Sequence, residues 1–194
     1  MKVSPITPAN SPATLPDLLR DGLAIVFVGI NPSVYSVQQG HYFARPTNRF
    51  WPAFSRSALS EGARRALGVD ALRAEHDALL LAHGFGFTDV VKRPTANVSK
   101  LAPGELAAAV PALLAKLAAL RPRIACFHGI TGYRPFHRAV FPASQRDPIL
   151  GLQDEVVGAT RLVVVPNPSP ANAHATPAGQ TAWYDRLAAL LAER

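Results

Sequence analysis

Four short apolar runs, each followed by polar residues, constrain the fold of this chain more than any other feature. They occupy residues 24–28, 85–91, 123–128 and 161–165. Apolar runs of this length are typical of strands that are buried on both faces of a parallel sheet. Segments with helical spacing separate the runs, at 69–83, at 101–120 and from about Thr131 onward. The alternation predicts an α/β fold, with a central, mainly parallel four-stranded sheet in a three-layer αβα arrangement.

The remaining segments complete this prediction. Thr176 and Pro177 form an N-cap and a first-turn proline, so a last helix is expected there. Asn48 can cap another helix that starts close to Arg49. Residues 141–158 carry turn signals without a clear period, which predicts a loop with short extended pieces. The proline-rich stretch 1–16 is expected to be a flexible tail, and 17–194 a single domain.

Polar residues directly follow three of the predicted strands. The three loops read GINPS at 29–33, TDVVKRPT at 88–95 and VPNPSP at 165–170. In a parallel sheet the carboxyl ends of the strands share one edge, and open α/β folds bind their ligands at that edge. The loops are therefore expected to build one site together.

Charge and motif content restrict the ligand of this site. Twenty Lys+Arg against 13 Asp+Glu give a formal net charge of +7, which suits an anionic partner such as nucleic acid. The turn GINPSV lacks the G-x-G-x-x-G pattern of dinucleotide-binding proteins, and Pro32 blocks that turn. No cofactor is therefore expected.

Metal sites and membrane contact are also disfavoured. Cys126 is the one cysteine, which excludes an internal disulfide, a four-cysteine zinc site and an iron–sulfur cluster held by four thiolates. The histidines form no HxxxH or HxE pattern, so no metal is expected. The chain has neither an 18-residue apolar run nor an apolar N-terminal signal segment. We therefore expect no membrane partner and a location in the cytoplasm, associated with the nucleoid.

Four sequence blocks together carry a resemblance to a known enzyme family. They are GINP at 29–32, GHYFARPTNRFW at 40–51, RPT at 93–95 and PNPS at 166–169. In this order, and over nearly the whole chain from about Leu18, they resemble the mismatch-specific uracil/thymine-DNA glycosylases. The resemblance implies a metal-free, usually monomeric, monofunctional enzyme whose partner is double-stranded DNA. Such an enzyme flips uracil, or thymine, out of a mispair such as G·U, and hydrolyses the N-glycosidic bond to leave an abasic site for base-excision repair.

The resemblance also implies roles for residues within these blocks and directly after them. Asn31 would hold the attacking water, Phe43 would stack on the flipped base, and Asn167 would lie close to the flipped nucleotide. The backbone N–H of Ile30 could donate to the base. The small side chain of Ser33 would leave room beside the C5 edge, which favours tolerance of thymine and other C5-substituted pyrimidines. The segment expected to enter the duplex through the minor groove contains Ser169, Pro170, Ala171 and Asn172.

Two of the loops depart from the pattern that the bacterial mismatch enzymes usually show. Pro170 and Ala171 stand where those enzymes have Gly-Leu, so a bulky wedge is missing. Asp89 stands where they carry lysine. A carboxylate there could act as a general base, could stabilise positive charge on the sugar, or could accept the uracil N3–H. A strand-end aspartate that only caps its own loop is the alternative.

The contacts with DNA and the catalytic assignment each have an alternative. Arg45 and Arg93 lie beside the predicted loops and could bind phosphates, which position a protein without reading sequence; each could also be a solvated surface charge. The chemistry depends on Asn31 and Asp89 alone. The alternative function is therefore a non-catalytic protein that binds damaged or mismatched DNA.

Overall fold

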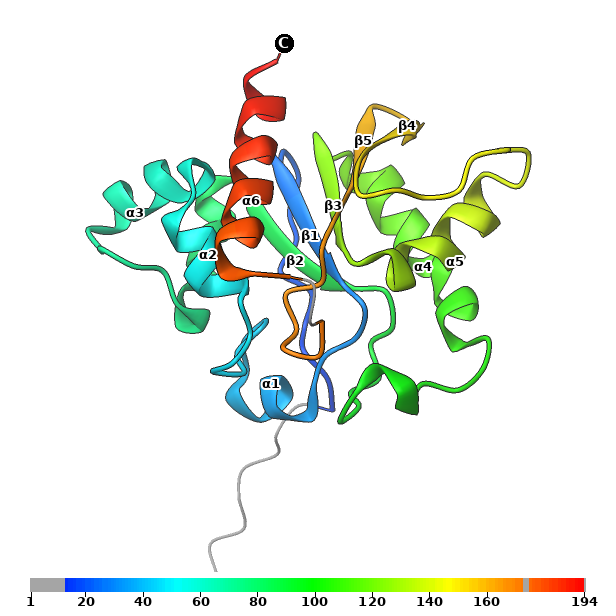
Figure 1. Ribbon diagram of the computed structural model, residues 1–194, viewed down its shortest axis with the longest axis horizontal. Helices are drawn as coiled ribbons and strands as arrows, with labels where there is room; N and C mark the ends of the chain where they lie inside the picture. Colours follow the sequence, from blue (N-terminus) through cyan, green and yellow to red (C-terminus); the bar gives the residue numbers. More distant parts are fainter. Residues whose placement is uncertain (1–12, 173–174, 194) are drawn as a thin grey trace, which may run out of the picture.

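The computed structural model describes residues 13–172 and 175–193, and a five-stranded sheet with helices on both faces forms its centre (Figure 1). The strands are β1 (Ile25–Gly29), β2 (Phe85–Asp89), β3 (Ile124–His128), β4 (Gly151–Val157) and β5 (Thr160–Val165). Their spatial order is β2-β1-β3-β5-β4, in which β4 alone pairs antiparallel. The predicted α/β class and the mainly parallel sheet are confirmed.

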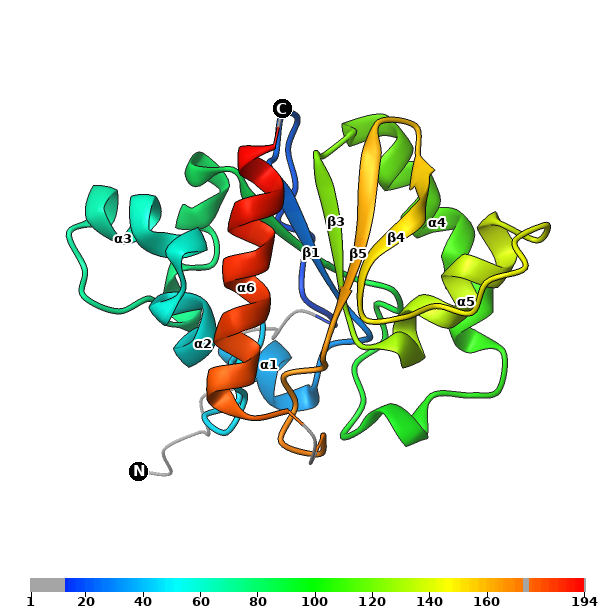
Figure 2. The same ribbon diagram turned by 45° about the horizontal axis from the view of Figure 1, so that its top comes forward.

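The predicted number of four strands is wrong, because part of the expected loop 141–158 forms β4. Figure 2 shows β4 at the edge of the sheet, next to β5. Its side chains alternate, so that Leu152 is exposed and Gln153 is buried, and its register with β5 shifts between Leu152 and Val156. A strand that packs on one face only has no continuous apolar run. An uninterrupted apolar run, which predicts the other four strands, is therefore absent from β4.

Helices cover the sheet on both sides and give the three layers (Figure 1). The helices are α1 (Val34–Gln39), α2 (Phe50–Arg56), α3 (Glu61–Leu67), α4 (Glu105–Leu120), α5 (Ile130–Val140) and α6 (Pro177–Ala192). The core beneath α2, α3 and α6 contains Ile25 and Phe27, whereas the core beneath α4 and α5 contains Val26 and Val28. Successive residues of β1 thus point to opposite faces, and both faces are buried.

The expected helix at 69–83 is replaced by two 3-10 turns, Ala74–His76 and Leu79–His83. Asp77 lies between them and is buried, and its carboxylate accepts hydrogen bonds from the backbone N–H groups of Tyr42 and Ala78. A continuous α-helix would not leave this carboxylate beside residue 42. Tertiary contact has therefore overridden the helical spacing of the segment.

Thr176 is the N-cap of α6, as predicted, whereas Arg49 is the N-cap position of α2 and Asn48 bonds to its first turn from one residue earlier. The Thr176 hydroxyl accepts from the N–H of Gly179 at 3.0 Å at the start of α6, and the Asn48 side chain accepts from the N–H of Phe50 at 2.9 Å. Residues 1–12 of the expected tail lie outside the described residues. Leu15 is 1% exposed, so the packed part of the chain begins before residue 17. None of the helices in the described ranges has the length and apolarity of a membrane-crossing segment.

Candidate active site

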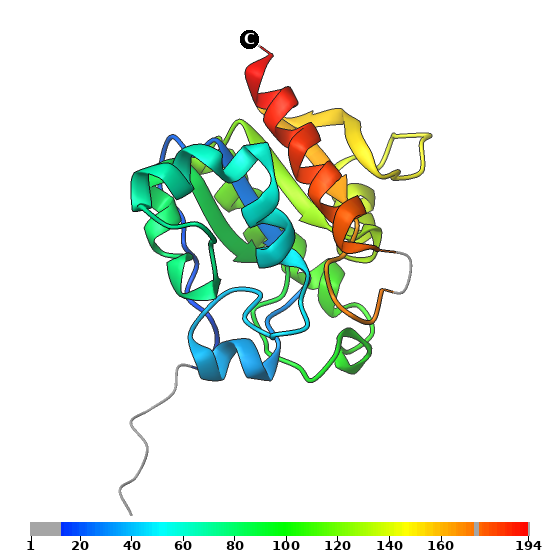
Figure 3. The same ribbon diagram turned by 60° about the vertical axis from the view of Figure 1, so that its left-hand side comes forward.

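The segments that follow β1, β2 and β5 gather at one end of the sheet (Figures 1 and 3), where they surround an open cavity of about 820 Å³. The strand ends are level, because Gly29 pairs with Asp89 and His128 pairs with Val165. Among the residues that the sequence singles out, those lining the cavity are Ile30, Asn31, Ser33, Phe43, Arg45, Asp89, Asn167, Ser169, Pro170, Ala171 and Asn172. Arg93 does not line it. The three loops therefore meet around one cavity, as their positions after parallel strands predict.

Asp89 ends β2 and places a carboxylate in this cavity with little access to water. The residue is 4% exposed, and its Oδ2 has no hydrogen-bond partner among the described residues. Burial raises the pKa of Asp89 to about 7 from an ordinary value of 3.8, while the nearby Lys92 lowers it and Asp17 raises it. Gly29 provides the space, since a Cβ there would lie 2.2 Å from Oδ1 of Asp89. The group can therefore bind and release a proton near neutral pH.

The raised pKa of Asp89 predicts a stability effect that does not depend on function. The unfolded chain releases this proton near pH 4, whereas the folded protein keeps it until about pH 7. The unfolding free energy should therefore fall as pH rises through this window, by on the order of a few kcal/mol for a fully buried group. Asp89→Asn removes the effect, so its melting temperature should exceed that of the native protein at pH 8 by more than at pH 5. Equal differences at the two pH values would contradict the buried, high-pKa carboxylate.

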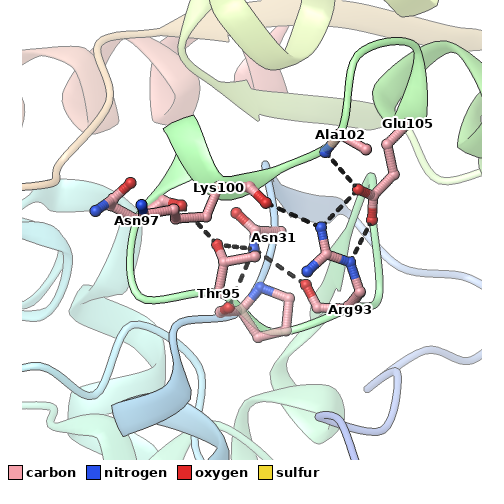
Figure 4. A network of polar contacts seen from close by, with 8 residues as sticks. Asn31, Arg93, Thr95, Asn97, Lys100, Ala102 and Glu105 are labelled. Atoms are coloured by element: carbon pink, nitrogen blue, oxygen red, sulfur yellow. Dashed lines mark hydrogen bonds and ion pairs between the residues drawn. The ribbon is translucent and has the colours of Figure 1, made fainter.

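Asn31 lies at the end of β1 in a network that fixes its side-chain amide (Figure 4). Its Nδ2 donates to Oγ1 of Thr95 at 2.7 Å and to the carbonyl of Arg93 at 3.1 Å, with the carbonyl of Pro32 at 3.3 Å. Thr95 in turn donates to the carbonyl of Asn97 at 2.8 Å. Because Nδ2 is engaged with the loop after β2 and the amide oxygen has no hydrogen bond within the described residues, the oxygen of this cavity-lining side chain is left to accept one.

Phe43 contributes an aromatic ring to the lining of the cavity. Its ring stacks on Phe50 with centroids 4.4 Å apart and planes at 17°, so one face is packed and the ring also lines the cavity. The His128 ring lies 5.1 Å from Phe43 and lines the same cavity. Burial lowers the pKa of His128 to about 3, so its imidazole is neutral at pH 7. His128 is not predicted as a site residue from the sequence, although a polar residue at the end of an apolar run is a usable signal.

The chain was also compared with known protein families and solved structures. A family model described as the uracil DNA glycosylase superfamily matches residues 16–190. The chain belongs to the uracil DNA glycosylase superfamily. The solution NMR structure of a Methanosarcina acetivorans protein, described as a candidate uracil DNA glycosylase, is similar at a TM-score of 0.53 and 21% sequence identity. The match covers 90% of this chain and 97% of that one, and at this identity it supports the fold.

Arg93, which the sequence offers as a phosphate contact or a solvated charge, is paired with Glu105 away from the cavity. Its guanidinium binds the Glu105 carboxylate through two hydrogen bonds of 2.8 and 2.7 Å, and it also donates to the carbonyl of Lys100 at 3.1 Å (Figure 4). The hydrogen bonds from Arg93 lower the pKa of Glu105 to about 2. Arg93 thus braces the loop whose carbonyl groups hold Asn31, and its charge is already paired inside the protein.

The loop after β5 is held in shape by its own polar groups and by Arg49. The Asn167 side-chain oxygen accepts from the N–H of Ser169 at 2.9 Å, and its backbone carbonyl accepts from the Asn172 side chain at 3.0 Å. Arg49 donates to the carbonyls of Ser169 and Asn172 at 2.9 and 3.1 Å. The sequence places Arg49 at the start of a helix and does not predict this bracing contact. The Nδ2 group of Asn167 stays without a protein acceptor in the described residues.

Three further predicted site residues line the cavity. Ser33 caps α1, where its hydroxyl accepts from the N–H of Ser36 at 3.0 Å. Ile30 is buried and its carbonyl accepts from the N–H of Val91. Arg45 is exposed, and its guanidinium forms no hydrogen bond or ion pair within the part of the chain that the structure describes. Within that part, no group of three or more His, Cys, Asp or Glu side chains could hold a metal ion.

Proposed function

We propose that this protein is a monofunctional DNA glycosylase that flips uracil out of mismatched duplex DNA, such as a G·U mispair, and hydrolyses its N-glycosidic bond. The observation that carries the proposal is the buried Asp89 carboxylate in one cavity with the oriented amide of Asn31 and the aromatic face of Phe43. A base inside a duplex cannot reach such a cavity unless it leaves the stack. A mispaired base leaves at the lowest cost, which favours mismatched DNA as the substrate.

The base would bind between the aromatic wall and the loops. Stacking on Phe43 is worth about 1–3 kcal/mol by analogy with single-strand binding. The Nδ2 group of Asn167 and the backbone N–H of Ile30 are available as donors to base oxygens. Ser33 lines the same cavity with a short side chain, which supports acceptance of thymine and other C5-substituted pyrimidines.

Hydrolysis then needs an activated water and a stabilised leaving group. The oxygen of Asn31 accepts a hydrogen bond from the water, and the Asp89 carboxylate takes the water's proton as the water oxygen bonds to C1′. The C1′–N1 bond breaks, N1 keeps the bonding electron pair, and donors around the base stabilise its negative charge. A carboxylate with a pKa of about 7 is suited to accept a proton at neutral pH. The products are the free base and an abasic site.

A strand-scission assay tests the proposed function. The protein is incubated with end-labelled duplexes that carry one G·U, A·U or G·T pair, and abasic sites are then cleaved with alkali. Scission at the G·U uracil is expected, and at a higher rate than at A·U. Salt-dependent binding to the same duplex without scission would instead identify a non-catalytic mismatch-binding protein.

The two arginines named by the sequence should differ in their contribution to DNA binding. Arg45→Ala removes an unpaired charge at the cavity rim and should reduce the slope of log K against log salt by about 1. Arg93→Ala is the matched control, because Glu105 already pairs with this arginine, and its slope should stay unchanged. Anisotropy titrations of a G·U duplex at several salt concentrations measure both. If only Arg93→Ala reduced the slope, Arg93 and not Arg45 would be the residue that contacts a phosphate.

A further inference from the structure

Tyr42 is a buried residue whose polar atoms are all hydrogen-bonded. Its N–H donates to Oδ2 of Asp77 at 2.9 Å, and its carbonyl accepts from the Trp51 indole at 2.8 Å. Its hydroxyl donates to the carbonyl of Pro16 at 3.0 Å and accepts from Nζ of Lys92 at 3.1 Å. The residue is therefore held at its main chain and at its hydroxyl, by partners from four separate segments of the chain.

The partners of Tyr42 are themselves rigid. Asp77 is 2% exposed and also accepts from the N–H of Ala78, so its buried charge is compensated by backbone donors. Trp51 belongs to α2 and is buried. The Tyr42 ring stacks on Phe87 of β2, with centroids 5.5 Å apart and planes at 28°. The peptide groups on both sides of Tyr42 are thus tied to the folded core.

Phe43, the next residue, has a backbone conformation that needs such support. Its φ is +53°, a left-handed value that costs a bulky side chain about 1–3 kcal/mol unless the surroundings impose it. The φ angle describes rotation relative to the peptide that joins residues 42 and 43, and Trp51 holds the carbonyl of that peptide. Phe50 holds the ring at the other end of the residue. The backbone and the ring of Phe43 are therefore fixed independently.

We propose that Tyr42 is the positioning residue for Phe43. Because its hydroxyl is anchored by Pro16 and Lys92, the Tyr42 side chain holds the peptide between the two residues in place and keeps Phe43 in its left-handed conformation before any base arrives. The inference rests on the proposed function, in which Phe43 stacks on the flipped base. Fixing the ring in advance removes the ordering cost from the binding step, so Tyr42 strengthens base binding without touching the reacting atoms.

A double-mutant cycle with Tyr42→Phe and Phe43→Ala tests this inference. Tyr42→Phe keeps the ring and loses both contacts of the hydroxyl. It should weaken binding of free uracil, measured as product inhibition, and raise KM about fivefold, because only part of the loss of the two hydrogen bonds is transmitted to Phe43, with kcat unchanged. In the Phe43→Ala background, Tyr42→Phe should have no further effect on either value, because the coupled group is gone.

A control variant and two results that would contradict the inference complete this test. Tyr133→Phe changes a fully buried tyrosine in the opposite core whose hydroxyl has no partner among the described residues, and it should leave uracil binding unchanged. Unchanged binding in Tyr42→Phe, or an equal loss with and without Phe43, would overturn the positioning role. If Phe43→Ala alone left uracil binding intact, the base-stacking part of the proposed function would fail instead, and the inference with it.

Discussion

Asp89→Asn is expected to lower the single-turnover rate of uracil release from a G·U duplex at pH 8 by about 10²–10⁴-fold, the usual contribution of a positioned general base. Asparagine keeps the size and shape of the side chain and cannot take a proton from water. The affinity for the duplex, measured in parallel by anisotropy, should not fall, because the substitution removes a negative charge. The variant thus separates the chemical step from DNA binding.

The pH dependence identifies which role Asp89 has. As a base, Asp89 must be ionised, and its folded-state pKa is raised to about 7. The rate of the native protein should therefore rise with pH up to about 7 and level off above it, whereas the variant should show no such rise. If Asp89→Asn keeps the pH profile of the native protein, Asp89 does not act as the general base. A variant that keeps the rate and accepts different bases would indicate that Asp89 recognises the uracil N3–H.

Gly29→Ala is expected to reduce the rate nearly as much as Asp89→Asn. The new Cβ would lie 2.2 Å from Oδ1 of Asp89 and 3.8 Å from the Phe43 ring, so the carboxylate has to move. A displacement of about 1 Å in a catalytic group can cost on the order of 10²-fold in rate. Overpacking at this position should also lower the unfolding free energy by about 1–3 kcal/mol. Single-turnover rates and thermal unfolding measure the two effects.

A second glycine and a double variant provide the controls for Gly29. Gly62 lies in α3, and a Cβ there would meet no atom within 4 Å, so Gly62→Ala should leave the rate unchanged. The Gly29→Ala substitution should add little to the rate loss of Asp89→Asn, since both act through the same carboxylate. Full activity in Gly29→Ala would mean that catalysis does not depend on the exact position of the Asp89 carboxylate.

The sequence predicts best the elements that are buried on both faces. The strand at 123–128 and the strand at 161–165 match β3 and β5 closely, because uninterrupted apolar runs leave few alternatives. Thr176 caps α6 as expected, since its capping bond is local in sequence. Elements whose structure depends on contacts between distant residues are not predicted from the sequence. β4 owes its pairing to β5, and the 3-10 turns around Asp77 owe their shape to Tyr42.

The candidate site shows the same limit. The loops after parallel strands predict that Asn31, Asp89 and Asn167 lie around one cavity, because topology alone brings strand ends together. The partners of these residues do not follow from that rule. Glu105 is 12 residues from Arg93 in sequence and still pairs with it, and Arg49 reaches the loop after β5 across 120 residues. Pairings of this kind depend on side-chain geometry that no local pattern encodes.

The bridge between Leu18 and Phe87 has a consequence for solubility. β2 ends the strand order on one side of the sheet, and Leu18 exchanges two backbone hydrogen bonds with Phe87 on its outer side, at 3.0 and 2.8 Å. Unpaired strand edges are templates for intermolecular β-pairing. Within the described residues, β4 is then the more open margin, and it exposes Leu152 and Val156. Aggregation of the folded protein at high concentration should start at β4, and removal of the first 18 residues should create a second starting point at β2.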